Sequence, residues 1–195
     1  SEDVINAYET SKTVLTGLGH KLIEVDFSEL SSGICSYYVI APAECSSNLS
    51  RFDGVKYGYR SEGEKDIANL YMNTRSDGFG DEVKKRILIG THVLSAGFYD
   101  AYYLQAQKVR RMIKVKFENF FKDVDLIFMP TTLDQAFEKN RKSDDPNRMY
   151  KEDLLTIPAN LAGLPAISFP NGFKNSLPIG GQLIGKYFCE DLLLN

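Results

Sequence analysis

A stretch rich in proline and glycine, residues 150–185, prescribes more backbone conformation than any other part of the sequence. It holds four of the seven prolines and five of the fifteen glycines in a chain of 195 residues. Thr156 suits the N-cap of a helix and Pro158 suits its first turn. Gly163 can end that helix in the left-handed conformation, and Pro165 blocks its continuation. We therefore predict a helix over residues 154–162.

Strands are predicted within this stretch, before it and near the start of the chain. Apolar runs at residues 166–169 and 182–185 predict two strands joined by a polar loop over residues 171–178, whose length suits a hairpin or a wider connection. The apolar run 124–129 predicts a buried parallel strand. Residues 21–25 alternate in polarity and predict a strand directly after a helix over residues 2–18.

Helices are predicted between these strands, over residues 37–49, 81–94 and 98–120. Pro42 must lie near the start of the first of them or kink it. Asp81 and Glu82 suit the positive end of the second. Helices and strands in this order predict an α/β fold with a mixed sheet covered by helices.

The composition excludes several classes of protein. The chain is 43% hydrophobic and 25% charged, as in globular domains, and its formal net charge of −3 gives no basic footprint for nucleic acid over the whole chain. No apolar run approaches the ~20 residues that a membrane-spanning helix needs. Three widely spaced cysteines form no metal-ligand pattern and predict reduced thiols in an intracellular protein.

Short motifs identify no catalytic machinery. The sequence contains no GxSxG elbow, no GxxxxGK phosphate loop and no GxGxxG dinucleotide fingerprint. Its two histidines, His20 and His92, stand in no metal-ligand spacing, so no metal site is predicted.

Longer segments resemble a known family. They are SYYVIAPAECSSNLSRFDGVKYGYR at residues 36–60, TRSDGFGDEVKKRILIGTHVLSAGFYDAYYLQAQKVRR at 74–111, DVDLIFMPTT at 123–132, NLAGLPAIS at 160–168 and LPIGGQLIG at 177–185. Together they resemble the amidase-signature enzymes, and most of all the glutamine-hydrolysing subunits of tRNA-dependent amidotransferases. The resemblance implies an incomplete amidase-signature fold. Residues 1–195 would form a single domain fragment from the C-terminal part, without the N-terminal catalytic half.

The resemblance also implies where catalysis resides. Enzymes of this family use a serine nucleophile, a second serine with a cis peptide bond, and a lysine that transfers protons. The serines lie in a Gly/Ser-rich segment that this sequence lacks. We therefore expect no catalytic residue in this chain and no activity from it alone, although the full-length protein would hydrolyse amides.

Three positions match residues that the glutamine-hydrolysing subunits use to hold their substrate. Tyr37 would offer its hydroxyl, Arg86 would bind the α-carboxylate of glutamine, and Asp153 would pair with the α-ammonium. The chemistry suits these roles, because a guanidinium matches a carboxylate bidentately and a zwitterion needs one fixed cation and one fixed anion.

The implied function is to release ammonia from glutamine for a partner subunit, which uses ATP and Mg²⁺ to convert Glu-tRNA(Gln) to Gln-tRNA(Gln). The tRNA would be bound mainly through that partner, with no cofactor in this chain and no membrane. The location would be cytoplasmic in a bacterium, and mitochondrial or plastid in a eukaryote. Two alternatives remain open: an amidase of other specificity, and a non-catalytic interaction module with the same fold.

Overall fold

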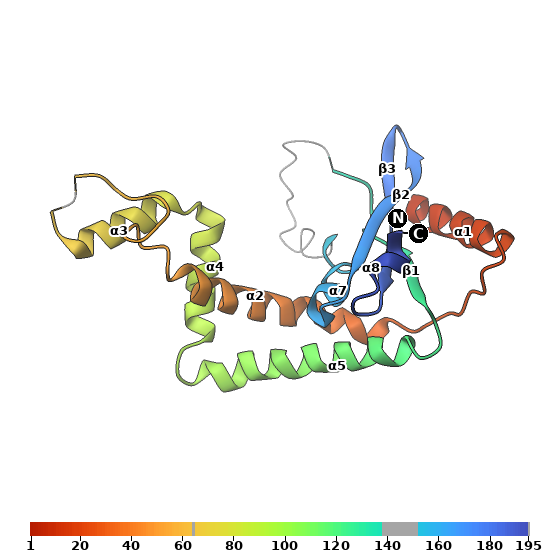
Figure 1. Cartoon of the computed structure of the whole chain (residues 1–195), viewed down its shortest axis with the longest axis horizontal. Helices are drawn as coiled ribbons and strands as arrows, with labels where there is room; N and C mark the ends of the chain where they lie inside the picture. Colours follow the sequence, from red (N-terminus) through yellow and green to blue (C-terminus); the bar gives the residue numbers. More distant parts are fainter. Residues whose placement is uncertain (64, 138–151, 195) are drawn as a thin grey trace. The chain divides into compact units, whose positions relative to one another are not determined.

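The computed structural model of the chain describes residues 1–63, 65–137 and 152–194, and it divides into two compact units (Figure 1). Unit 1 comprises residues 1–34 and 109–195, and unit 2 comprises residues 35–108. The helices are α1 (Glu2–Gly17), α2 (Gly33–Leu49), α3 (Ile67–Gly78), α4 (Asp81–Val93), α5 (Leu104–Phe120), α7 (Ile157–Ala162) and α8 (Glu190–Leu194), with a 3₁₀ turn at Ser28–Ser32 and a π-helical segment at Tyr99–Tyr103. The strands are β1 (Leu126–Pro130), β2 (Ala166–Lys174) and β3 (Leu177–Gly185).

Unit 1 is built on a three-stranded sheet whose two faces contact different helices. Side chains alternate between the faces along each strand. Ile127 of β1 and its register partner Ile184 of β3 are buried in a core that includes Ile113 and Phe117 of α5. Phe128 points to the opposite face, where its ring stacks on Tyr8 of α1 with centroids 5.2 Å apart. The α/β fold class is therefore confirmed.

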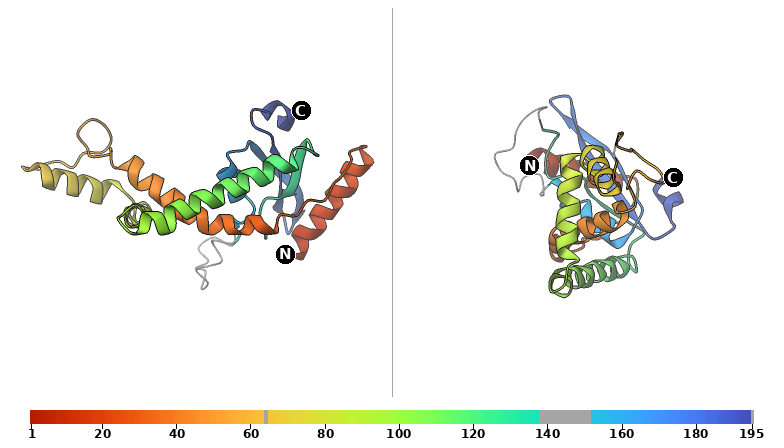
Figure 2. Two further views of the ribbon diagram at one scale, coloured as in Figure 1. Left: turned by 90° about the horizontal axis from the view of Figure 1, so that it is seen from below. Right: turned by 90° about the vertical axis from the view of Figure 1, so that its left-hand side faces the viewer.

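The sheet is antiparallel in the described chain, with the order β1-β3-β2. Figure 2 gives two further views of the ribbon, in which the strands are coloured teal and blue. The predicted parallel direction of the strand at residues 124–129 is wrong, because β1 pairs antiparallel with β3. An apolar run indicates burial on two faces and carries no information about strand direction. Here both faces of β1 contact helices, which accounts for its uniformly apolar sequence.

The predicted polar loop at residues 171–178 is also wrong, since most of it extends the strands of a hairpin. Asn175 and Ser176 form the two-residue turn, with φ of 51° and 64°. Positive φ at both central positions is the geometry of a type I′ turn, which matches the twist of the flanking strands. The register shifts between Pro170 and Gly172, so the proline lies on an outer strand beside a bulge. Proline lacks the N–H that a ladder requires, so it is tolerated on an outer strand or at a bulge, where that donor is not needed.

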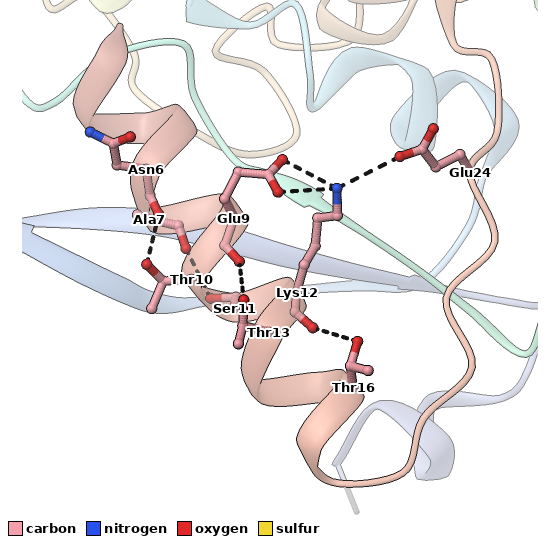
Figure 3. A network of polar contacts seen from close by, with 9 residues as sticks. All are labelled: Asn6, Ala7, Glu9, Thr10, Ser11, Lys12, Thr13, Thr16 and Glu24. Carbon is pink, nitrogen blue, oxygen red and sulfur yellow. Dashed lines mark hydrogen bonds and ion pairs between the residues drawn. The ribbon is translucent and has the colours of Figure 1, made fainter.

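Helix α1 confirms the predicted helix at residues 2–18, but residues 21–25 form no strand. They are largely exposed, and Glu24 turns back to α1, where its carboxylate lies 3.6 Å from the ammonium of Lys12 (Figure 3). Lys12 also pairs with Glu9 at 3.2 Å. Alternating polarity is compatible with a strand, but it does not supply a neighbouring strand with which to pair.

Helix α7 ends at Ala162 as predicted but begins at Ile157, three residues later than predicted, with Thr156 at the N-cap and Gly163 in the left-handed conformation at φ 74°. The Thr156 side chain makes no capping bond to the helix; its hydroxyl donates instead to the carbonyl of Asp153 at 3.3 Å. Pro158 lies in the first turn, as expected, and it is buried.

Gln182 connects the sheet to the turn that precedes α7. Its side chain is only 3% exposed, and its amide Nε2 donates to the carbonyl oxygen of Pro130 at 3.2 Å and to that of Leu155 at 2.9 Å. One buried amide therefore satisfies two carbonyls, one at the end of β1 and one in the turn that contains Asp153.

Unit 2 consists of three main helices and the irregular segment that follows α2. Helix α2 begins four residues earlier than predicted and contains Pro42 in its interior. Arg75 of α3 donates to the carbonyls of Leu49 at 2.8 Å and Phe52 at 3.1 Å, so its guanidinium satisfies acceptors at the end of α2. Asp66 caps α3 by accepting from two backbone amides of the first turn. Whether the two units form one domain fragment stays a prediction.

Replacing Gln182 by methionine should destabilise the protein by about 1–3 kcal/mol. The substitution keeps the length of the side chain but leaves the carbonyls of Pro130 and Leu155 without their donor. Urea denaturation measures the effect. Gln135→Met is the matched control, because Gln135 lies at the surface and its side chain makes only a 3.4 Å bond. An equal loss for both variants would contradict the structural role of the buried amide.

Candidate substrate-binding site

Tyr37 and Arg86 come from two different helices of unit 2 and meet through their side chains. Tyr37 lies on α2 and Arg86 lies on α4, and the phenol is close enough to the guanidinium to raise its pKa. Tyr37 is half-buried, and its ring meets that of Tyr38 edge to face at 5.2 Å. The structure therefore brings together two of the three residues expected to bind substrate.

A carboxylate completes this pair. The Nε atom of Arg86 donates to Oε1 of Glu82, one turn earlier on α4, at 3.1 Å. The pKa of Arg86 is raised, chiefly by the hydrogen bond to Glu82 and further by the bond to Tyr37, while partial desolvation acts against both. Arg86 is thus held as a permanent cation by one anionic and one neutral partner.

Helix α4 begins where the sequence predicted. Gly80 is the N-cap, in an extended conformation, and Asp81 and Glu82 occupy the first turn. Negative side chains are favourable there because the unpaired N–H groups give the helix start a partial positive charge. Arg86 follows Glu82 at the i+4 spacing, which puts the two side chains on the same side of the helix.

The distance between α2 and α4 is set by a glycine. A Cβ placed on Gly90 would lie 1.9 Å from the carbonyl oxygen of Pro42 and 2.8 Å from Cβ of Ser46, so the backbones touch at this point. One residue further along, the hydroxyls of Thr91 and Ser46 share a hydrogen bond of 2.9 Å. Gly90 lies one turn beyond Arg86 on the same face, so this contact holds the helices close enough for Arg86 to reach α2.

Asp153 belongs to unit 1, where it opens the turn before α7. Its carbonyl accepts hydrogen bonds from the amides of Thr156 at 3.2 Å and Ile157 at 3.0 Å. Asp153 is half-buried, and the bond from Gln182 to Leu155 fixes the turn that contains it. Its pairing with Tyr37 and Arg86 around one substrate stays a prediction.

Two residues of the site were not identified as functional from the sequence. Glu82 was expected only to favour the start of a helix, although its i,i+4 spacing to Arg86 was visible. Gly90 has no local signal for its role, because its contact with Pro42 joins residues far apart in the chain.

Two absences concern the residues that the structure describes, one of a metal-binding group and one of a membrane-spanning helix. Among residues 1–63, 65–137 and 152–194, no group of three or more His, Cys, Asp or Glu side chains is placed to hold a metal ion. None of the helices in that same part of the chain has the length and apolar character that crossing a bilayer needs. Cys35, Cys45 and Cys189 are free thiols.

Comparison with known proteins identifies the family. The family model described as Amidase matches residues 1–194. The chain belongs to the amidase family. The resemblance seen in the sequence is confirmed.

Individual relatives of this amidase chain carry a more specific name. The A-subunit of glutamyl-tRNA(Gln) amidotransferase from Hahella chejuensis is 56% identical over 193 residues, which are 99% of this chain and 40% of the relative. The protein of the same name from Coxiella burnetii is 53% identical over 195 residues, again 40% of the relative. The chain thus spans about two fifths of the length of these relatives.

Solved structures agree. The crystal structure of the glutamyl-tRNA(Gln) amidotransferase A-subunit from Thermotoga maritima superposes with a TM-score of 0.70 at 40% identity, covering 97% of this chain and 36% of that one. A bacterial aryl acylamidase of the amidase signature family has a TM-score of 0.62 at 20% identity and covers 97% of this chain and 38% of that one, which shows the fold alone.

Substituting alanine for Gly90 should destabilise this amidase chain by about 1–3 kcal/mol, because the added methyl meets backbone atoms that cannot move aside. Urea denaturation measures the loss. Gly17→Ala in α1 is the control, since nothing lies within 4 Å of its added methyl. That change should be neutral or stabilise by up to about 1 kcal/mol through helix propensity. A Gly90→Ala protein as stable as the wild type would contradict the contact between α2 and α4.

Proposed function

We propose that this chain provides the glutamine-binding side of the glutamine-hydrolysing subunit of a glutamyl-tRNA(Gln) amidotransferase. The observation that carries the proposal is the Arg86 guanidinium, which Glu82 holds on α4 at 3.1 Å and which lies near the hydroxyl of Tyr37 on α2. The relatives at 53–56% identity, which carry the name of this component of the enzyme, support it.

The pair suits the amino-acid end of glutamine. Nε of Arg86 is occupied by Glu82, so its terminal nitrogens are the donors available to a carboxylate. Tyr37 adds a hydroxyl at the same place. Asp153 supplies the anion that the α-ammonium of the substrate requires. A substrate without these charges, such as an aryl amide, has no use for a paired cation and anion.

The nucleophile of the reaction comes from outside these 195 residues. A serine elsewhere in the full-length protein attacks the side-chain amide, an acyl-enzyme forms, and ammonia leaves. Donors in an oxyanion hole stabilise the tetrahedral states. Ammonia then passes to a partner subunit, which binds ATP, Mg²⁺ and most of the tRNA. The bacterial relatives support a cytoplasmic location.

Replacing Arg86 by alanine should impair glutamine hydrolysis about 30-fold or more in kcat/KM. Loss of one partner from a desolvated charge pair costs about 2–5 kcal/mol, and the 36% exposure of the Arg86 side chain places the effect at the lower end. Arg86→Lys should recover only part of the activity, because an ammonium lacks the planar fork. The measurement is ammonia release by an assembled amidotransferase whose glutamine-hydrolysing component carries this chain. Unchanged kcat/KM in Arg86→Ala would refute the proposed function.

Asp153→Asn should impair glutamine more than glutaramate, the analogue of glutamine that lacks the α-ammonium. The substitution keeps the size of the side chain and removes its charge, so only a substrate with an ammonium loses a partner. The ratio of kcat/KM for the two substrates is the readout, measured in the same assembled enzyme. An equal loss for both substrates would make Asp153 a structural residue.

A further inference from the structure

We infer that Glu82 is a positioning residue for substrate binding, which holds the Arg86 guanidinium by Nε so that its terminal nitrogens present a preformed fork to the substrate carboxylate. This inference rests on the proposed function and adds a residue to it.

The geometry gives Glu82 a specific atom of Arg86. The Glu82 carboxylate accepts from Nε, the donor nearest the aliphatic stem, at 3.1 Å. Arginine has five N–H donors in a rigid plane, so fixing the one on Nε restricts the rotation of the whole group. Tyr37 also contacts the guanidinium, but it is itself expected to bind substrate. Glu82 is therefore the contact to which we assign the positioning of the guanidinium.

A neighbouring ion pair leaves Glu82 available for this task. Lys84 lies between Glu82 and Arg86 in the sequence. Its ammonium pairs with Asp81, in the first turn of α4, at 3.0 Å. Glu82 pairs with Arg86. Asp81 and Glu82, in one helical turn, therefore pair with two different basic residues. A substitution of Asp81 can thus serve as the control for a substitution of Glu82.

Stability alone gives little reason for the Glu82–Arg86 pair. Its side chains are 60% and 36% exposed, and pairs that are this open to solvent contribute little to folding. Ordering a long side chain when substrate binds carries an entropic cost. A partner that already orders the side chain in the free protein reduces this cost at the binding step. The contribution of Glu82 should therefore appear in substrate binding and not in the stability of the fold.

Two substitutions separate position from charge. Glu82→Gln keeps an oxygen that can accept from Nε and removes the negative charge, which would otherwise repel a substrate carboxylate. Glu82→Ala removes the acceptor altogether. A positioning role predicts that KM for glutamine stays within about 2-fold of wild type in Glu82→Gln and rises roughly 3- to 10-fold in Glu82→Ala, with kcat little changed.

The experiment measures steady-state ammonia release by the assembled amidotransferase, wild type and four variants: Glu82→Ala, Glu82→Gln, Asp81→Ala and Arg86→Ala. Each is tested with glutamine and with 4-aminobutanamide, which is glutamine without its α-carboxylate. In Glu82→Ala, KM should rise for glutamine and stay unchanged for the analogue, because the analogue makes no use of the fork. Asp81→Ala, which removes an acid from the same turn, should behave as wild type with both substrates.

The outcomes distinguish the positioning role of Glu82 from the proposed function of the chain. If Arg86→Ala impairs glutamine use while Glu82→Ala leaves KM unchanged, the positioning role is overturned and the proposed function stands. If Arg86→Ala leaves kcat/KM for glutamine unchanged, the proposed function is refuted, and the positioning role of Glu82 is refuted with it. If Glu82→Ala impairs glutamine and 4-aminobutanamide equally, or Asp81→Ala matches it, Glu82 acts on the fold and the inference is overturned.

Discussion

The contact between Gly90 and the carbonyl of Pro42 is the constraint on which the candidate site depends. Helices with side chains between them lie 8–10 Å apart, and only a residue without a Cβ allows two backbones to touch. The hydroxyl pair Ser46–Thr91 lies beside this point and adds a directional bond. Arg86 lies one turn away on the same helix face. The small size of Gly90 therefore brings the Arg86 guanidinium within reach of Tyr37 on α2.

The third candidate residue depends on a different kind of support. Asp153 lies in a turn whose backbone is fixed by hydrogen bonds to its own carbonyl and by the buried amide of Gln182. A buried amide is specific because its donors must find acceptors, whereas apolar contacts tolerate small shifts. Steric contact thus fixes the distance between the helices of Tyr37 and Arg86, and directional hydrogen bonding fixes the turn of Asp153.

Features decided by local chemistry were predictable from the sequence. The helix that ends at Gly163 followed from residues within one turn of each other, as did the acidic start of α4. The strand expected at residues 21–25 was not found, because alternation describes a surface and pairing needs a second strand. The direction of β1 was missed because Ile127 and Phe128 are both covered by helices, and such a run suits either direction.

The candidate site was predictable only in part. Resemblance to the amidase family indicated Tyr37, Arg86 and Asp153 as a set, and the structure joins the first two. The link between them runs through Gly90 and Pro42, which are 48 residues apart, so no pattern in a short window could reveal it.

The strand order β1-β3-β2 has a consequence for the time course of folding. β3 is the central strand, and it is the last of the three to be synthesised. β1 therefore waits for nearly 50 residues of further translation before its hydrogen-bonding partner exists, while β2 needs only the two residues of its turn. Closing a long loop is slow relative to closing a hairpin, so β2 and β3 should pair first and then recruit β1. During that interval the apolar edge of β1 is a site at which a nascent chain can be captured by a chaperone or by another unfinished copy of itself.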